Sequence, residues 1–136
     1  LCAHLHEHID REIREEGAPL APHECLARGA GACRDLAELL NAAARVMGIA
    51  ARFVSGYRWG EGIDEAYMHA WSEVYLPGAG WRGYDPVEGL AVADRHVPVA
   101  ASPHADGAAP TFGTFRRTGA DATLSTDLRV EALDAD

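Results

Sequence analysis

The segment Pro77-Gly78-Ala79-Gly80 is the strongest constraint on the fold, because no β-strand can run through it. Residues 67–76 before it are rich in aromatic and β-branched side chains, and residues 81–85 repeat this composition directly after it. Two such stretches joined by a short glycine-rich turn form a β-hairpin. The sequence therefore predicts an antiparallel pair of strands in the middle of the chain.

Two helices are expected before this hairpin. Apolar residues recur every four positions from Leu1 to Ile13, which predicts an amphipathic helix that ends at Gly17, followed by a loop rich in Pro, Ala and Gly. Residues 33–47 then place leucine, alanine and methionine side chains on one helical face, and Gly48 supplies the stop. This second helix is the strongest helical prediction in the chain.

The remaining elements are short. Residues 52–57 predict a strand, and residues 60–65 a loop. The Val-Pro-Val segment at 97–99 predicts an edge strand, because proline has no N–H to donate within a sheet. Residues 100–110 are expected to form a long surface loop. One or two further strands at most are expected near Phe112, Phe115, Leu124, Leu128 and Val130.

Length and composition exclude several classes of protein. The 136 residues predict one domain over 1–136, and because the chain begins with Leu1 we interpret it as a fragment of a longer protein. Twelve basic and 21 acidic residues give a net charge of −9, which disfavours a nucleic-acid partner. No apolar run is long enough for a membrane span, and three cysteines cannot build a disulfide framework. A cytoplasmic location is expected, and the oligomeric state stays open.

Cys33 lies at the predicted start of the second helix, after the small residues at 29–32. A thiol in the first turn of a helix is close to unpaired amide donors and to the positive end of the helix dipole, which favours the thiolate. The thiolate is the attacking form of a cysteine nucleophile, and the backbone N–H of Cys33 can donate to an oxyanion. The negative charge of Asp35 partly opposes this effect, and Arg34 offsets it. For a lone cysteine, packing as a small hydrophobic residue remains the commoner role.

The hairpin adds an imidazole and a carboxylate, since His69 lies on its first strand and Asp85 ends its second. Side chains alternate between the two faces, so these two share a face only if the numbers of paired residues add up to an even value. Pairing of Tyr75 with Trp81 meets this condition and puts Asp85 diagonal to His69, within side-chain reach. We therefore predict a five-residue connection or a bulge. Singly, His69 and Asp85 fit ordinary strand and turn roles, but together with Cys33 they predict a catalytic set.

These segments resemble the core of bacterial transglutaminase-like proteins, which belong to the papain-like superfamily. The resemblance implies an α+β fold in which the nucleophile helix packs against an antiparallel β-sheet. It also implies that Cys33 is the nucleophile, His69 the base and later the acid, and Asp85 the residue that orients the imidazole. The segments that carry the resemblance are Gly31-Ala32-Cys33-Arg34-Asp35, residues 48–57, residues 69–81 and Asp85-Pro86.

The implied reaction is cysteine-dependent acyl transfer or hydrolysis on a protein or peptide amide, through a thioester on Cys33. The same triad serves cysteine peptidases and amidases, which are the first alternative, and a non-catalytic interaction module that keeps the fold is the second. No cofactor is expected, and no acidic loop supports the calcium dependence known in animal relatives. Tyr57 and Trp71 are candidates for lining a substrate pocket, with packing in the core as their alternative role.

Histidines near the N-terminus are the other candidates for chemistry. His4 and His8 share a helical face, but no third ligand is evident from the spacing, so a solvated face is the better interpretation. Cys2 and Cys25 are expected to be packing thiols, because no Cys-x-x-Cys pair exists. No metal site is therefore predicted, and the second oxyanion donor stays unassigned.

Overall fold

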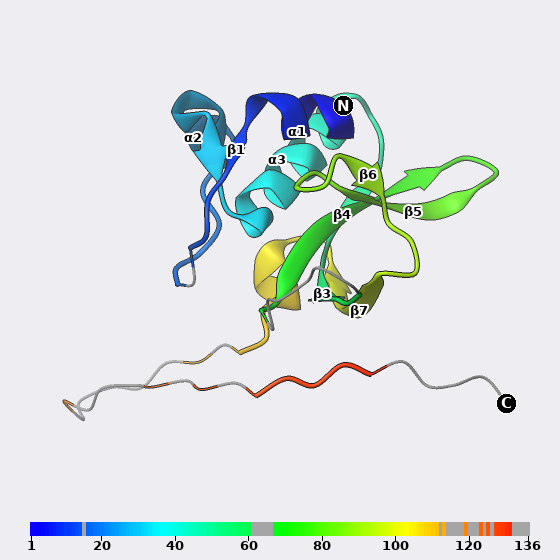
Figure 1. Cartoon of the computed structure of the whole chain (residues 1–136). Helices are drawn as coiled ribbons and strands as arrows, with labels where there is room; N and C mark the ends of the chain where they lie inside the picture. The colour runs from blue at the N-terminus through cyan, green and yellow to red at the C-terminus, as the bar shows by residue number, and fades with distance from the viewer. Residues whose placement is uncertain are drawn as a thin grey trace, which may run out of the picture.

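The computed structural model describes residues 1–14, 16–60, 67–111, 113, 119, 123, 125 and 127–131. Figure 1 shows the helices labelled α1, α2 and α3 gathered on one side of a twisted sheet. The helical elements are α1 (Cys2–His8), α2 (Pro22–Arg28), α3 (Cys33–Val46) and the 3-10 helix η1 (Ala105–Ala108). The strands are β1 (Asp10–Arg11), β2 (Ala30–Gly31), β3 (Ala51–Arg58), β4 (His69–Leu76), β5 (Gly80–Asp85), β6 (Leu90–Ala91) and β7 (His96–Ser102).

The main sheet has five antiparallel strands in the order β6-β5-β4-β3-β7. One face of β3 and β4 packs against α3, where the Ser72 hydroxyl donates to the carbonyl of Ala37 over 2.8 Å. The combination of a helix with an antiparallel sheet confirms the predicted α+β class.

The β4–β5 hairpin has the predicted register. Tyr75 pairs with Trp81, and the ladder continues for one more pair, Leu76 with Gly80, so only residues 77–79 form the turn. Because Ser72 pairs with Tyr84 in the same ladder, Asp85 falls on the face that carries His69. The hairpin thus delivers both side chains to one side of the sheet.

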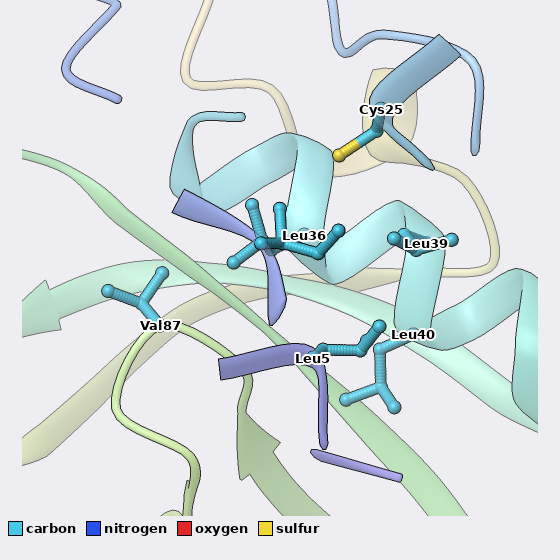
Figure 2. Close-up of a cluster of buried hydrophobic side chains, with 7 residues drawn as sticks. Leu5, Cys25, Leu36, Leu39, Leu40 and Val87 are labelled. Carbon is cyan, nitrogen blue, oxygen red and sulfur yellow. The ribbon is translucent and has the colours of Figure 1, made fainter. Parts of the chain in front are cut away.

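Helix α3 begins and ends within one residue of its predicted limits. At its first turn the carboxylate of Asp35 accepts a hydrogen bond of 2.8 Å from the N–H of Ala32, the residue just before the helix. Its leucines form a buried cluster together with side chains from α1, α2 and the turn after β5 (Figure 2). The buried members of this cluster are Leu5, Ile9, Cys25, Leu36, Leu39, Leu40 and Val87.

The N-terminal helix is much shorter than predicted. Helix α1 ends at His8, Ile9 is extended, and strands β1 and β2 pair in parallel, with Asp10 opposite Ala30. Ile13, which the prediction placed on the apolar stripe, is 68% exposed. The prediction was wrong because a pairing with a distant segment replaces the local helical bonds, which sequence periodicity cannot reveal.

Two segments predicted as loops contain helices. Helix α2 begins with Pro22 at its first position, its Glu24 carboxylate accepts from the N–H of Ala21 over 2.9 Å, and it stops at Gly29 with a φ of 65°. The sequence contains the three residues that mark this helix, but the Ala- and Gly-rich composition of the segment predicted a loop. The predicted loop over 100–110 is also wrong, because β7 continues to Ser102 and η1 follows.

The edge position predicted from Pro98 is confirmed, since β7 forms one edge of the sheet and shifts register against β3 beside Pro98. The predictions for Phe112, Phe115 and Leu124 lie outside the described residues, as does the loop over 61–65. Leu128 and Val130 are described and carry no strand. Among the helices of the described part of the chain, none has the length and apolar character needed to cross a bilayer.

Candidate active site

Cys33 is the first residue of α3 and lies half-buried where this helix meets β4. Burial by itself raises the pKa of the thiol. Opposing it are a side-chain hydrogen bond and the charge of His69, a hydrogen bond from the backbone of Ala70, and the charge of Arg34, which together bring the pKa of Cys33 below its ordinary value. The thiol is therefore held in surroundings that favour the thiolate.

His69 is the first residue of β4, and its ring is buried. Its Nε2 lies 2.6 Å from Oδ2 of Asp85, which leaves Nδ1 as the ring nitrogen that can serve the thiol of Cys33. Burial lowers the pKa of His69, but the hydrogen bonds and charges of Asp85 and Cys33 outweigh it and raise the pKa to about 9. The imidazole is thus set between an anion and a thiol, which favours an imidazolium paired with a thiolate.

Asp85 ends β5 and is completely buried. Its Oδ1 accepts a hydrogen bond of 2.8 Å from the N–H of Val87, and its Oδ2 faces His69. Although burial alone raises the pKa of this carboxyl, its bonds with His69, His96 and Val87 hold the pKa well below the usual range. Asp85 is therefore a fixed anion beside the imidazole.

The structure brings the three residues of the predicted catalytic set together: Cys33 from α3, His69 from β4 and Asp85 from β5. It also adds a residue that the sequence analysis did not name. The Nε2 of His96, the first residue of β7, lies 3.0 Å from the same Oδ2 of Asp85. Two signals in the sequence mark its position, the predicted edge strand at 97–99 that follows it and a weaker likeness of residues 94–97 to the same transglutaminase-like family. Neither assigns it a partner, because Asp85 is reached through the pairing of β7 with β3.

The two predicted substrate-binding residues lie in different surroundings. Trp71 is 0% exposed, and its indole packs beneath the imidazoles, edge-on to His96 at 5.1 Å between ring centroids and 6.2 Å from His69. Trp71 packs against these two rings and does not reach the surface. Tyr57 is half-buried in β3, paired with Val97 beside His96.

The other two cysteines differ from Cys33 in their electrostatic surroundings. Burial, followed by the charge of Asp85, raises the pKa of Cys2 to about 11. Burial also raises the pKa of Cys25, with the charge of Asp35 as the next largest cause. All three cysteines are free thiols. Selective alkylation is therefore expected at Cys33.

Two groups of potential metal ligands occur within the described residues. His4, Glu7 and His8 are exposed on α1, and the ring of His8 already bonds the carbonyl of His4 through Nδ1. In the second group, Oδ2 of Asp85 lies 2.6 and 3.0 Å from Nε2 of His69 and His96. Ligand atoms around a tetrahedral zinc ion lie about 3.3 Å apart, so these shorter distances fit hydrogen bonds.

A family model described as the transglutaminase-like superfamily matches residues 1–86 of this chain. The chain belongs to the transglutaminase-like superfamily. The segment matched in this transglutaminase-like chain contains Cys33, His69 and Asp85, whereas His96 lies beyond it.

The chain is also similar to individual proteins. An uncharacterized protein of Mycobacterium leprae is 31% identical over 110 residues, which cover 74% of this transglutaminase-like chain and 36% of that protein. One from Mycobacterium bovis is 34% identical over 90 residues, covering 57% of the chain and 28% of the relative. The crystal structure of a "putative cysteine protease" from Cytophaga hutchinsonii matches with a TM-score of 0.69 and 25% identity, covering 79% of this chain and 36% of that one. The chain thus spans about a third of the length of these proteins.

Proposed function

We propose that residues 1–136 form a single catalytic domain that performs cysteine-dependent acyl transfer or hydrolysis on protein or peptide amides. The observation that carries this proposal is the buried 2.6 Å hydrogen bond between His69 and Asp85, with Cys33 close enough for the imidazole to lower the pKa of its thiol. A thiol with a lowered pKa, beside an imidazole whose pKa is raised to about 9, is the pairing that a cysteine nucleophile requires. Membership of the transglutaminase-like superfamily supports it.

The first half of the reaction uses the thiolate of Cys33 and the proton on His69. The sulfur attacks the carbonyl carbon of the substrate amide, and the negative charge moves to the carbonyl oxygen. His69 then gives its proton to the leaving nitrogen, the C–N bond breaks, and ammonia or an amine departs. Asp85 keeps the imidazole oriented and stabilises its charged form. A thioester on Cys33 remains.

In the second half His69 acts as the base. It takes a proton from an amine or from water, which attacks the carbonyl carbon of the thioester. The C–S bond then breaks, the acyl product leaves, and Cys33 departs as the thiolate beside the protonated His69, which restores the thiolate–imidazolium pair. The backbone N–H of Cys33 has no intrahelical acceptor at the first position of α3, so it can donate to the oxyanion in both halves. The acceptor decides whether the enzyme is a transferase or a hydrolase.

A cysteine peptidase or amidase is the second candidate, because a solved structure that resembles this chain is described as a "putative cysteine protease". A non-catalytic interaction module is the third, and it requires that Cys33 react like an ordinary thiol.

The test is alkylation with limiting iodoacetamide at pH 7, with the site of labelling read by mass spectrometry. We expect labelling at Cys33 and a loss of at least about tenfold in rate in His69→Ala. Equal labelling of all three cysteines supports the interaction module and contradicts the enzyme.

The acceptor is identified by following ammonia release from glutamine-containing peptides, with and without an added primary amine. The chain contains no Lys and no Gln, so it supplies neither group of a glutamine–lysine crosslink itself. Incorporation of the amine identifies a transferase, deamidation alone an amidase, and backbone cleavage a peptidase. The matched control is Cys33→Ser, and product formation that survives in this variant contradicts the proposal.

A further inference from the structure

Two imidazoles approach one oxygen of Asp85. Nε2 of His69 lies 2.6 Å from Oδ2, and Nε2 of His96 lies 3.0 Å from the same atom. An ionised carboxylate can only accept hydrogen bonds, so both Nε2 atoms carry a proton and donate it. Backbone N–H groups donate to the other oxygen, Oδ1, from Val87 over 2.8 Å and from Glu88 over 3.4 Å.

The side chain of His96 is buried and packed against the other residues of the site. Its side chain is 3% exposed, Trp71 packs edge-on against it, and its ring centroid lies 6.2 Å from that of His69. Its Nδ1 is buried and has no hydrogen-bond partner within the described residues. Among the described residues, the polar contact that the ring makes at hydrogen-bond distance is therefore the one to Asp85.

The other charges around the two imidazoles compensate one another. Glu88 places a carboxylate oxygen 3.9 Å from Nε2 of His96, and Arg58 from β3 neutralises Glu88 through an ion pair of 2.6 Å. On the side of His69, the titratable partners are Cys33 and Asp85. The carboxylate of Asp85 is thus the anion that both rings share.

We propose that His96 is a positioning residue of this site, which fixes the carboxylate of Asp85 and divides its capacity to accept hydrogen bonds between two imidazoles. This inference rests on the proposed function and assigns to it a residue outside the triad. Because two donors on one oxygen weaken each other's bonds, His96 limits how strongly Asp85 holds the proton on His69. The imidazolium therefore remains able to release its proton to the leaving group.

The experiment compares His96→Leu, which fills the space without a donor, with His96→Gln, whose side-chain amide keeps one at similar reach. Iodoacetate is an anionic alkylating reagent, so its rate at Cys33 rises when the thiolate forms and falls when His69 loses its positive charge. We follow this rate from pH 5 to 10.5 by mass spectrometry of the Cys33 peptide. In the unaltered chain the rate is expected to fall near pH 9, where the pKa of His69 lies.

In His96→Leu the falling limb is expected to move to higher pH by about 0.5–1 unit, because Asp85 then serves His69 alone. In His96→Gln it is expected to stay with the unaltered chain. Superimposed profiles for all three proteins, or an equal shift in both variants, overturn the inference. If instead the unaltered chain shows only a single rise near the pKa of an ordinary thiol, about 8.5, the proposed function itself fails.

A second measurement needs no variant. Two-bond nitrogen–hydrogen NMR spectra of the imidazole rings report which nitrogen carries the proton. We expect a protonated Nε2 for both His69 and His96 at pH 7. An unprotonated Nε2 on His96 overturns the inference even where neither variant folds.

Discussion

Tyr75 pairs with Trp81 across the β4–β5 hairpin, and the two rings meet edge-to-face at 5.6 Å between centroids. The guanidinium of Arg52 lies 4.3 Å from the centroid of the Trp81 ring on its open face. This pair stands in the ladder whose register brings Asp85 to the same face as His69. The aromatic contact stabilises the exposed end of the hairpin, and the other pairs of the ladder hold the same register.

Replacing Trp81 by alanine is expected to lower the free energy of unfolding by about 1–2 kcal/mol, through loss of the aromatic pair and the cation–π contact. The remaining pairs, such as Val74 with Arg82, keep the register, so the alkylation rate of Cys33 in the folded variant should stay unchanged. Urea unfolding followed by circular dichroism and the alkylation assay measure the two effects. The exposed Leu90→Ala on β6 is the control. A loss of Cys33 reactivity in folded Trp81→Ala contradicts this view of the register.

Asp85→Asn is expected to change the pH dependence of stability in two directions. The folded-state pKa of Asp85 is lowered, so its stabilisation is present above the unfolded pKa of about 4 and disappears as the pH falls below it. The pKa of His69 is raised to about 9, so its stabilisation is present below the unfolded value of about 6.5 and disappears as the pH rises to 9.

The difference in unfolding free energy between the unaltered chain and Asp85→Asn should therefore be largest between about pH 5 and 6.5. It should shrink on both sides of this window. Urea unfolding at half-unit steps from pH 3 to 9.5 measures it. A difference that is constant over this range contradicts the assignment of Asp85 and His69 as a charged pair.

Gly56→Ala is expected to disrupt the packing of Trp71 against the two imidazoles of the site. A Cβ atom at Gly56 would lie 2.1 Å from the carbonyl oxygen of Val97 and 2.7 Å from the ring of Trp71. We expect a loss of about 3 kcal/mol in the free energy of unfolding together with slower alkylation of Cys33, because Trp71 packs against both imidazoles. Thermal unfolding and the alkylation assay measure the effects. Gly113→Ala, where a Cβ meets nothing within 4 Å, is the matched control.

Asp35 links the start of helix α3 to the segment that precedes it. Its buried carboxylate accepts hydrogen bonds from Arg14 at 2.6 Å, from the N–H of Leu20 at 2.7 Å and from the N–H of Ala32 at 2.8 Å. Asp35→Asn turns an amide group toward these donors, and we expect a loss of about 3 kcal/mol in urea unfolding. In the control Glu12→Gln, which breaks an exposed ion pair with Arg28, the loss should stay below about 0.5 kcal/mol. Equal losses in the two variants contradict the role of Asp35.

Local patterns in the sequence were sufficient for helix α3 and for the hairpin. The spacing of leucines and the stop at Gly48 located α3 within one residue, and the parity of paired positions selected the correct partner for Tyr75. The same reasoning failed at residues 10 and 11, because their strand forms only by pairing with Ala30 and Gly31. Helix α2 differs from the predicted loop although Pro22 and Gly29 mark its ends, because a segment rich in Pro, Ala and Gly is more typical of a loop than of a seven-residue helix.

The residues of the candidate site also fall into those that local sequence patterns predict and one that they do not. Cys33, His69 and Asp85 are predictable as neighbours because a helix start and a single hairpin bring them together. His96 is not, because its ring reaches Asp85 only after β7 has paired with β3 on the far side of β4. A residue held by a strand from elsewhere in the sheet leaves no periodic signal near the motif it serves.

The order of the site residues along the chain has a consequence for biosynthesis. The sulfur is made first, then the base, the carboxylate and finally the second ring on an edge strand. A ribosome-bound chain that has not yet completed β7 carries a thiol without its full set of partners. Under the proposed function the triad is complete once β5 has paired with β4, so the thiol of a shorter emerging chain lacks the carboxylate that holds its imidazole.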